Sequence, residues 1–285
     1  SSGKVSLLDI CAGNARPCMT GEVDLRQLIE LIIRGGWPGS LGLPVSQAAL
    51  LPGEYLNAVI DDDAYRMDGI KRDTTKMRRL LRSLARNEST TATNKTLVRD
   101  IKAVDDEDID SDTVAVYLDV FKRLFLTENQ APFSSGMRSS VRVKQAEKRH
   151  FSDPSLACAL LKATPQSLLG DLETLGFLFE ALCERDLRIY AESFGGELYH
   201  YQDYRGKEID AVIELSDGQW CAFEIKLGAN QIDAAAKNLV DIKREFEADP
   251  KGKAPDAMCV VCGMANAAYL RSDGVFVVPI TALKD

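Results

Sequence analysis

Near the end of the chain, hydrophobic and polar positions alternate in two short runs that flank a turn. Residues 207–226 read KEIDAVIELSDGQWCAFEIK. Successive side chains of a strand point to opposite faces, so this alternation is typical of strands. Asp-Gly between two such runs is a strong hairpin signal. The pattern therefore predicts two antiparallel strands joined by a tight turn at residues 216–218.

The register of this hairpin decides which side chains share a face. With Asp217 at the centre of the turn, Leu215 lies opposite Gln219, and by the same count Asp210 lies opposite Glu224. One face then carries Glu208, Asp210, Val212, Trp220, Ala222, Glu224 and Lys226, and the other carries Ile209, Ala211, Ile213, Cys221, Phe223, Ile225 and Leu227. We expect the second, apolar face to be core. A slip of one residue would place the two acids on opposite faces.

Two interpretations of the charged face remain open. Asp210 and Glu224 as cross-strand neighbours destabilise a hairpin unless something compensates their charges, and a divalent cation between them would do so. Lys226, on the same face, would then suit charge stabilisation in phosphodiester cleavage. Alternatively, the face is the solvated side of an ordinary antiparallel hairpin. Glu208 and Lys226 would then form a surface ion pair of little energetic value.

Apolar residues at helical spacing predict most of the other elements. Helices are expected at residues 23–33, 48–67, 73–99 (two helices, the second reaching 101), 165–188 and 229–246, and strands at 125–129, 197–201, 257–262 and 275–280. Asp73 or Thr74 would cap the first helix of the pair, and Thr93 would begin the second. Ser111 or Asp112 would cap a further helix that follows them.

The middle of the chain has the element order of a winged helix-turn-helix. Two helices and a third are followed by the 125–129 strand and by a basic, turn-rich segment at 138–149. In the DNA-binding form of this motif the third helix enters the major groove. Here that helix carries basic side chains, Lys122 and Arg123, only near its end. A DNA-binding module and a module for packing or protein contact both fit this pattern.

The predicted fold class is a multi-domain combination of α+β and α/β structure. The expected domains are a loose N-terminal linker (1–22), a helical segment (23–70), a winged-helix-like domain (71–153) and an α/β domain with a mixed sheet (154–285). A chain of 285 residues is long enough for two to three such domains.

Composition and charge narrow the classes of function. The net charge of −8 argues against a protein coated for nucleic-acid binding. Basic residues nevertheless concentrate in 71–102, and an acidic run at 105–108, expected to be a solvated loop, follows them. The candidate nucleic-acid contacts are Arg78, Arg82, Lys95, Lys122, Arg123 and Arg142. No apolar run is long enough to span a bilayer. The seven cysteines have no pairing pattern and are expected to be reduced core residues, as in a cytoplasmic protein.

The C-terminal element order, helix, three strands, helix and two strands, resembles the PD-(D/E)xK nuclease superfamily, which has the restriction-endonuclease-like fold. The matching residues are Glu180 on the first helix, Asp210 on the second strand, and Glu224 and Lys226 on the third. The resemblance implies a Mg²⁺ or Mn²⁺ site held by the three acids and the backbone carbonyl of Ile225. It also implies a catalytic role for Asp210, Glu224 and Lys226 in cutting nucleic acid. The competing hypothesis is a non-catalytic interaction or regulatory module.

The whole chain looks like the C-terminal half of prokaryotic AAA-type ATPases that carry the domain of unknown function 4143. The residues that suggest it are the runs RGGWP at 34–38, LLRSLARN at 80–87, VYL at 116–118, RHFSDP at 149–154, GFLFE at 176–180, GKEID at 206–210 and EIK at 224–226. In that family a P-loop ATPase module precedes this region. No Walker A motif is present here, so we expect no nucleotide in this chain and interpret residues 1–20 as a remnant of the ATPase. The expected partners are nucleic acid and that ATPase domain, and no membrane.

Overall fold

The computed structural model describes residues 3–106, 108–134 and 146–285, and the chain divides into two compact units. The first unit comprises Ser1–Leu28, Gln130–Gln145 and Cys183–Asp285, and we call it the sheet unit. The second comprises Ile29–Asn129 and Ala146–Leu182, and we call it the helical unit. Each unit is therefore built from separate stretches of chain, whereas the sequence suggested domains that follow one another.

The sheet unit contains a mixed sheet of eight strands in the order β2-β8-β9-β7-β6-β5-β4-β3. The strands are β2 (Cys18–Met19), β3 (Ala131–Pro132), β4 (Glu197–Gln202), β5 (Glu208–Glu214), β6 (Trp220–Lys226), β7 (Ala257–Cys262), β8 (Ala267–Leu270) and β9 (Val275–Pro279). Three neighbouring pairs are parallel, namely β3–β4, β6–β7 and β7–β9, and the others are antiparallel. The mixed α/β class and the mixed sheet are thus confirmed.

The predicted hairpin forms β5 and β6 in the predicted register. Ala211 pairs with Phe223 and Ile213 with Cys221, and the N–H of Leu215 donates to the Gln219 carbonyl at 2.8 Å. The three-residue turn closes because Gly218 adopts a left-handed φ of 76°, which glycine does without steric cost.

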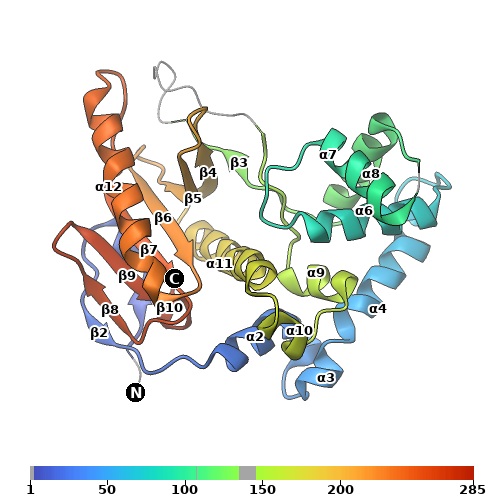
Figure 1. Cartoon of the computed structure of the whole chain (residues 1–285), viewed down its shortest axis with the longest axis horizontal. Helices are drawn as coiled ribbons and strands as arrows, with labels where there is room; N and C mark the ends of the chain where they lie inside the picture. The colour runs from blue at the N-terminus through green and yellow to red at the C-terminus, as the bar shows by residue number, and fades with distance from the viewer. Residues whose placement is uncertain (1–2, 107, 135–145) are drawn as a thin grey trace. The chain divides into compact units, whose positions relative to one another are not determined.

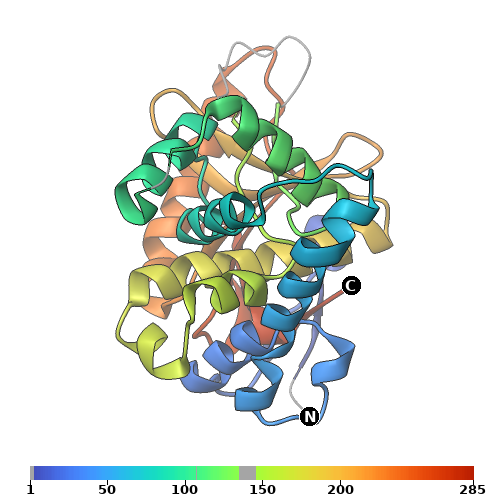
Figure 2. The same cartoon turned by 90° about the vertical axis from the view of Figure 1, so that its right-hand side faces the viewer.

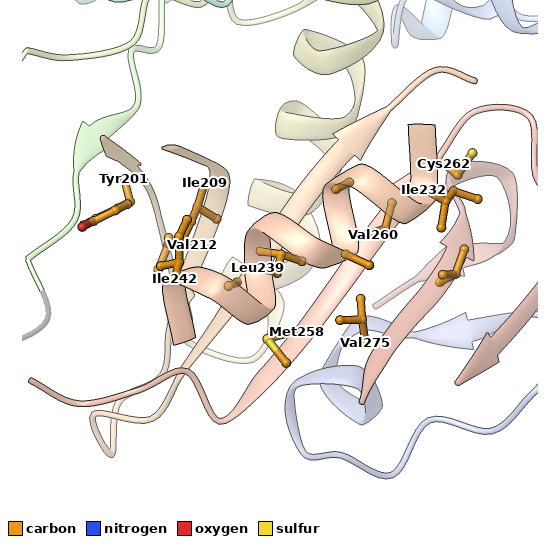
Figure 3. Packing of buried hydrophobic residues seen from close by; sticks show 14 of the residues in the cluster. Tyr201, Ile209, Val212, Ile232, Leu239, Ile242, Met258, Val260, Cys262 and Val275 are labelled. Atoms are coloured by element: carbon orange, nitrogen blue, oxygen red, sulfur yellow. The ribbon is translucent and has the colours of Figure 1, made fainter. Parts of the chain in front are cut away.

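Both faces of this hairpin are buried, so the half-solvated interpretation of the charged face is wrong. The long helix α12 (Ile232–Ala248) lies on β6 and β7 (Figure 1). Its Leu239 and Ile242 join a core cluster with Val212 and Val260 (Figure 3). Only the end of the charged face opens to solvent, where Glu208 is exposed.

The N-terminal residues are part of the sheet unit, which corrects the expectation of a loose segment. Strand β1 (Val5–Ser6) pairs in parallel with β10 (Leu283–Lys284), and β2 extends the large sheet by pairing with β8. Helix α1 (Leu7–Cys11) buries Leu7, Ile10 and Cys11. Such two-residue strands give too short an alternation to be read from sequence.

The helical unit consists of short helices, which Figure 2 shows from a second side. They are most of α2 (Leu25–Arg34), then α3 (Val45–Ala48), α4 (Leu51–Ala58), a π-helical turn (Val59–Asp63), α5 (Ala64–Arg66), α6 (Thr74–Arg86), α7 (Asn94–Asp105), α8 (Ser111–Arg123), α9 (Pro154–Leu161), α10 (Pro165–Leu169) and the first half of α11 (Leu172–Ser193). A three-residue 3-10 turn lies at Pro38–Ser40 in this unit, and two more lie at Ala229–Gln231 and Ile280–Ala282 in the sheet unit. The caps Asp73 and Thr93 are confirmed by bonds to the N–H groups of Lys76 and Thr96. The third cap is Asp110, one residue before those predicted.

Three local predictions in this region are wrong. The 165–188 helix is two helices, because Asp171 accepts the N–H of Thr174 at 3.0 Å and so starts α11 anew. The 125–129 strand is reduced to an isolated bridge between Thr127 and Phe151. The acidic run does not lie wholly in solvent, since Asp105 ends α7 and pairs with Arg86 at 3.1 Å. The rest of the expected wing, residues 138–145, lies outside the described residues.

The cysteines behave as the sequence indicated. All seven are free thiols, and six of them are buried, with Cys18 the half-buried exception. Burial raises the pKa of the Cys259 thiol, so a buried thiol of this kind is unreactive. Within the described ranges, no helix has the length and apolar character that crossing a membrane requires.

Candidate functional site

The two acids of the hairpin meet where β5 and β6 begin to separate. Asp210 is 4% exposed and Glu224 is 3% exposed. In a regular ladder the N–H of Ile225 would bond to the facing backbone carbonyl. Instead it donates to Asp210 Oδ2 at 2.8 Å. The Asp210 carboxylate thus replaces a backbone carbonyl as the acceptor for the N–H of Ile225.

A single ammonium group bridges both carboxylates. Lys226 Nζ lies 2.9 Å from Asp210 Oδ2 and 2.6 Å from Glu224 Oε2. The side chain of Lys226 is 27% exposed, so it connects the buried acids to solvent. Lys226 therefore pairs with these two acids, whereas the surface interpretation of the hairpin gave it Glu208 as a partner. Two buried carboxyl groups thus converge on one position that a cation occupies.

The electrostatics of the site follow from burial and from this arrangement. Burial raises the pKa of Glu224 to about 8, with a further contribution from the charge of Asp210, while Lys226 and Asn238 oppose the rise. Burial alone would lower the pKa of Lys226, but Asp210 and Glu224 raise it above its usual value. The two acids therefore hold Lys226 in its charged form.

Asn238 on α12 completes the site and was missed by the sequence analysis. Its Nδ2 donates to Glu224 Oε1 and to the Glu208 carbonyl, each at 2.8 Å. A signal was present, because Asn238 lies next to the buried Leu239, at the edge of the apolar stripe of α12. A polar side chain at the edge of such a stripe can bond to a charged residue of the strand that the helix covers, as Asn238 does to Glu224.

Gln130 is a second residue that the sequence analysis missed. Its Nε2 donates to the backbone carbonyls of Tyr199 at 2.7 Å and Asp210 at 3.1 Å. The side chain is fully buried, and it lies where the pairing of β4 and β5 shifts register between Tyr199 and Tyr201. It supports the strand that carries Asp210. No sequence pattern marks it, since its partners lie 69 and 80 positions further along the chain.

Glu180, the third acid suggested by the resemblance, has another partner. It lies in the helical unit, where Lys148 Nζ approaches its Oε1 to 2.6 Å and both side chains are largely buried. Among the residues that the structure describes, no group of three His, Cys, Asp or Glu side chains is placed to hold a metal. The arrangement around β5 and β6 is therefore a two-carboxylate site.

The candidate nucleic-acid contacts are partly engaged in ion pairs of the helical unit. Arg78 makes a two-pronged contact with Asp61 at 2.8 and 2.9 Å. Arg82 lies 3.7 Å from Asp105, and Arg123 lies 4.0 Å from Asp119. Lys95 and Lys122 are exposed, and Arg142 falls outside the described residues. The basic character of this region is thus weaker at its surface than in its sequence.

Two family models match the chain. The class defined by the fold is a mixed α/β protein in which a helical unit accompanies a sheet unit. A family model described as Domain of unknown function (DUF8612) matches residues 25–167, half of the chain, and the chain belongs to this family. A second model, Domain of unknown function (DUF4143), matches residues 175–283. This match agrees with the resemblance seen in the sequence. No curated protein matches the chain.

Proposed function

We propose that the sheet unit is a nuclease-like domain whose Asp210, Glu224 and Lys226 cut phosphodiester bonds with the help of Mg²⁺ or Mn²⁺. The observation that carries the proposal is the convergence of two buried carboxylates on one cation. The order of α11, β4 to β6, α12 and the later strands supports it, because it matches the PD-(D/E)xK order closely.

The donor set fits a small hard cation. Mg²⁺ prefers oxygen ligands and is commonly held by one or two carboxylates, with waters and substrate phosphates completing its shell. Asp210 and Glu224 supply two such carboxylates, and the oxygens that face Lys226 already lie close together. When bound, the metal would lower the pKa of a water and stabilise charge on the phosphoryl group.

Each residue of the chain then has a role that its position supports. Asp210 and Glu224 hold the cation, and Asn238 fixes the Glu224 carboxylate through its Oε1. Lys226, which reaches solvent, turns toward the substrate and either orients the attacking water or neutralises the scissile phosphate. Glu180 takes no part in this version of the site.

The wider setting follows the family resemblance. We propose that the substrate is nucleic acid, that α6 to α8 form a winged-helix-like module, and that an ATPase domain of the same full-length chain is the partner. The protein would act in the cytoplasm, and this region would bind no nucleotide.

A non-catalytic role is the second candidate, and specific contacts favour it. Lys226, Asn238 and the N–H of Ile225 satisfy the two carboxylates without a metal. Glu180 is paired with Lys148. In this version the acids and Lys226 are a buried ion cluster that gives the hairpin a unique register, and the unit serves as an interaction or regulatory module for the ATPase.

Thermal unfolding in EDTA, Mg²⁺ and Mn²⁺ separates the two candidates. A cation that binds only the folded protein raises its stability by mass action, so the midpoint of the wild type should rise with either metal. The rise should vanish in Asp210→Asn. Glu214→Gln is the matched control, since Glu214 lies at the other end of β5, is half-buried and is outside the site. Equal shifts in all three proteins, or none in any, would leave the non-catalytic role.

Cleavage is then tested on labelled single- and double-stranded DNA and RNA. Wild type and Glu214→Gln should cut in Mn²⁺ or Mg²⁺, and Asp210→Asn and Lys226→Met should not. A variant of Asp210 that cut as fast as the wild type would contradict the assignment.

A further inference from the structure

Phe125 is an aromatic residue in a backbone conformation that normally belongs to glycine. It follows α8 with a φ of 54°. The N–H of Leu126 reaches back to the Phe121 carbonyl at 2.9 Å, and the N–H of Phe125 bonds to the Lys122 carbonyl at 3.1 Å. Helices that end in this way usually place glycine at the left-handed position, because a side chain there is strained.

The strain at Phe125 is not offset by packing of its ring. The residue is 80% exposed, the largest exposed fraction among the large hydrophobic residues in the described part of the chain. Its backbone, in contrast, is held firmly. Ser152 Oγ donates to the Phe125 carbonyl at 2.6 Å, and the next residue, Leu126, is fully buried. The fold therefore holds this ring out into solvent at a cost in stability, which makes Phe125 a candidate for a functional role.

Two cationic residues precede Phe125 closely in the chain. Lys122 and Arg123, at the end of α8, are both exposed. Arg123 lies 4.0 Å from Asp119, and both side chains are more than half exposed, so this ion pair is weak. The end of α8 thus combines an exposed aromatic residue with two exposed basic residues.

We propose that Phe125, with Lys122 and Arg123, is a stacking platform for a base of single-stranded nucleic acid. Every base has a π-face, so stacking on an aromatic ring tolerates any sequence, while cations beside the ring contact the phosphates. The strand must be single because neighbours cover both faces of a base inside a duplex. The inference takes its class of ligand from the proposed function, but it needs neither the metal nor cleavage.

The test is fluorescence anisotropy of a labelled oligothymidylate in EDTA, where no cleavage can occur. Truncating a stacking ring typically weakens binding by roughly fivefold to a hundredfold, and we expect a loss in that range for Phe125→Gly and Phe125→Leu. Phe125→Trp should bind as well as the wild type or better. Tyr204→Ala is the matched control, because Tyr204 is an exposed aromatic residue of the sheet unit at 67% exposure, and it should bind as the wild type does.

A second readout separates stacking from a structural role. Because glycine relieves the left-handed strain, Phe125→Gly should unfold at the same temperature as the wild type or a higher one while it binds less well. Lys122→Ala should reduce the slope of log affinity against log salt by about 0.7, the value for one phosphate contact on a single strand, and Phe125→Gly should leave that slope unchanged.

Two results would overturn the proposal. One is equal affinity of Phe125→Gly and wild type. The other is a wild type that binds no single strand in EDTA. A metal-dependent rise in the unfolding midpoint would survive either result, so failure of this inference is distinguishable from failure of the metal site.

Discussion

The backbone N–H of Gly36 donates to Asp153 Oδ2 at 2.9 Å, across 117 positions of the chain. Beside it, Trp37 Nε1 donates to Ser155 Oγ at 2.8 Å. Asp153 also accepts the N–H of Ser155 at 2.9 Å and so caps α9. Two of the sequence runs that carry the family resemblance, 34–38 and 149–154, thus contact each other inside the helical unit. Their role is to hold that unit together.

Substituting Gly35 tests this contact. Gly35 has a φ of 68°, and an added Cβ would lie 2.6 Å from Asp153 Oδ1 and closer still to Ser155 Oγ. Gly35→Ala should therefore destabilise the protein by about 2 kcal/mol or more, since left-handed strain and a clash add together. Urea unfolding measures the change. Gly39→Ala is the control, because its nearest neighbour would be Leu51 Cδ1 at 3.8 Å. Equal effects of the two substitutions would show that the contact is unimportant.

Removing the shared ammonium should be costly. In Lys226→Met two buried carboxylates lose their common cation, and breaking a buried ion pair from one side typically costs about 3–5 kcal/mol. The loss should be larger at alkaline pH, where both carboxylates are ionised, than at neutral pH, because the pKa of Glu224 is about 8 and its carboxyl can hold a proton below that value. Urea unfolding in EDTA at neutral and alkaline pH measures both effects. Lys237→Met, which removes an exposed lysine that pairs with Asp241 on α12, should leave the unfolding midpoint nearly unchanged. A mild effect of Lys226→Met at alkaline pH would mean that the acids are solvated.

A third carboxylate in the site should make the folded protein bind a divalent metal more tightly. Asn238 Nδ2 lies 2.8 Å from Glu224 Oε1, so Asn238→Asp replaces a donor by a second negative charge. We expect this variant to be less stable than the wild type in EDTA and to gain more stability from Mn²⁺ than the wild type gains. Asn238→Ala removes the same hydrogen bonds without adding charge, and it should show the loss but not the additional gain. If the aspartate and alanine variants responded alike to Mn²⁺, no cation would bind beside Glu224.

The loss of stability at acidic pH should depend on the protonation of Asp203. Burial opposes ionisation of this residue, but bonds from the N–H groups of Lys207 and Arg205 and from the Arg205 guanidinium outweigh it, so its pKa lies below the ordinary value of 3.8. A lowered pKa means that the folded state holds the ionised form, so this stability is present above pH 3.8 and disappears as the pH falls through the lower, folded-state value.

The matching variant is Asp203→Asn. At neutral pH it should be less stable than the wild type by about 1.5–3 kcal/mol, the range for hydrogen bonds to a charged group, and the difference should vanish at strongly acidic pH. Urea midpoints from neutral to acidic pH give this curve. The control is Asp217→Asn in the exposed turn, where the N–H of Gln219 donates to Asp217 Oδ1 at 2.9 Å. Its urea midpoints should follow those of the wild type at every pH. A constant difference for Asp203→Asn would show that its charge is not involved.

The sequence predicted correctly those elements that depend on residues a few positions apart. Asp73 and Thr93 begin helices because their side chains bond to an N–H three residues away. The Asp-Gly turn set the register that places Asp210 beside Glu224. The prediction failed where two local signals, apolar spacing and a capping residue, disagreed. Asp171 divided a helix that its apolar spacing would have continued.

The sequence by itself determined the strand pair, its register, the amphipathic helices and the residues able to form an acidic site, because each of these rests on period and on contacts a few residues apart. Only the tertiary structure decided that the charged face is buried beneath α12, that Lys226 bridges both acids, and that Asn238 and Gln130 support them. It also paired Glu180 with Lys148 and brought the first residues into the sheet unit. The physical reason is that burial and pairing of charges depend on segments far apart in the chain, and a carboxylate follows the partner that the fold brings to it.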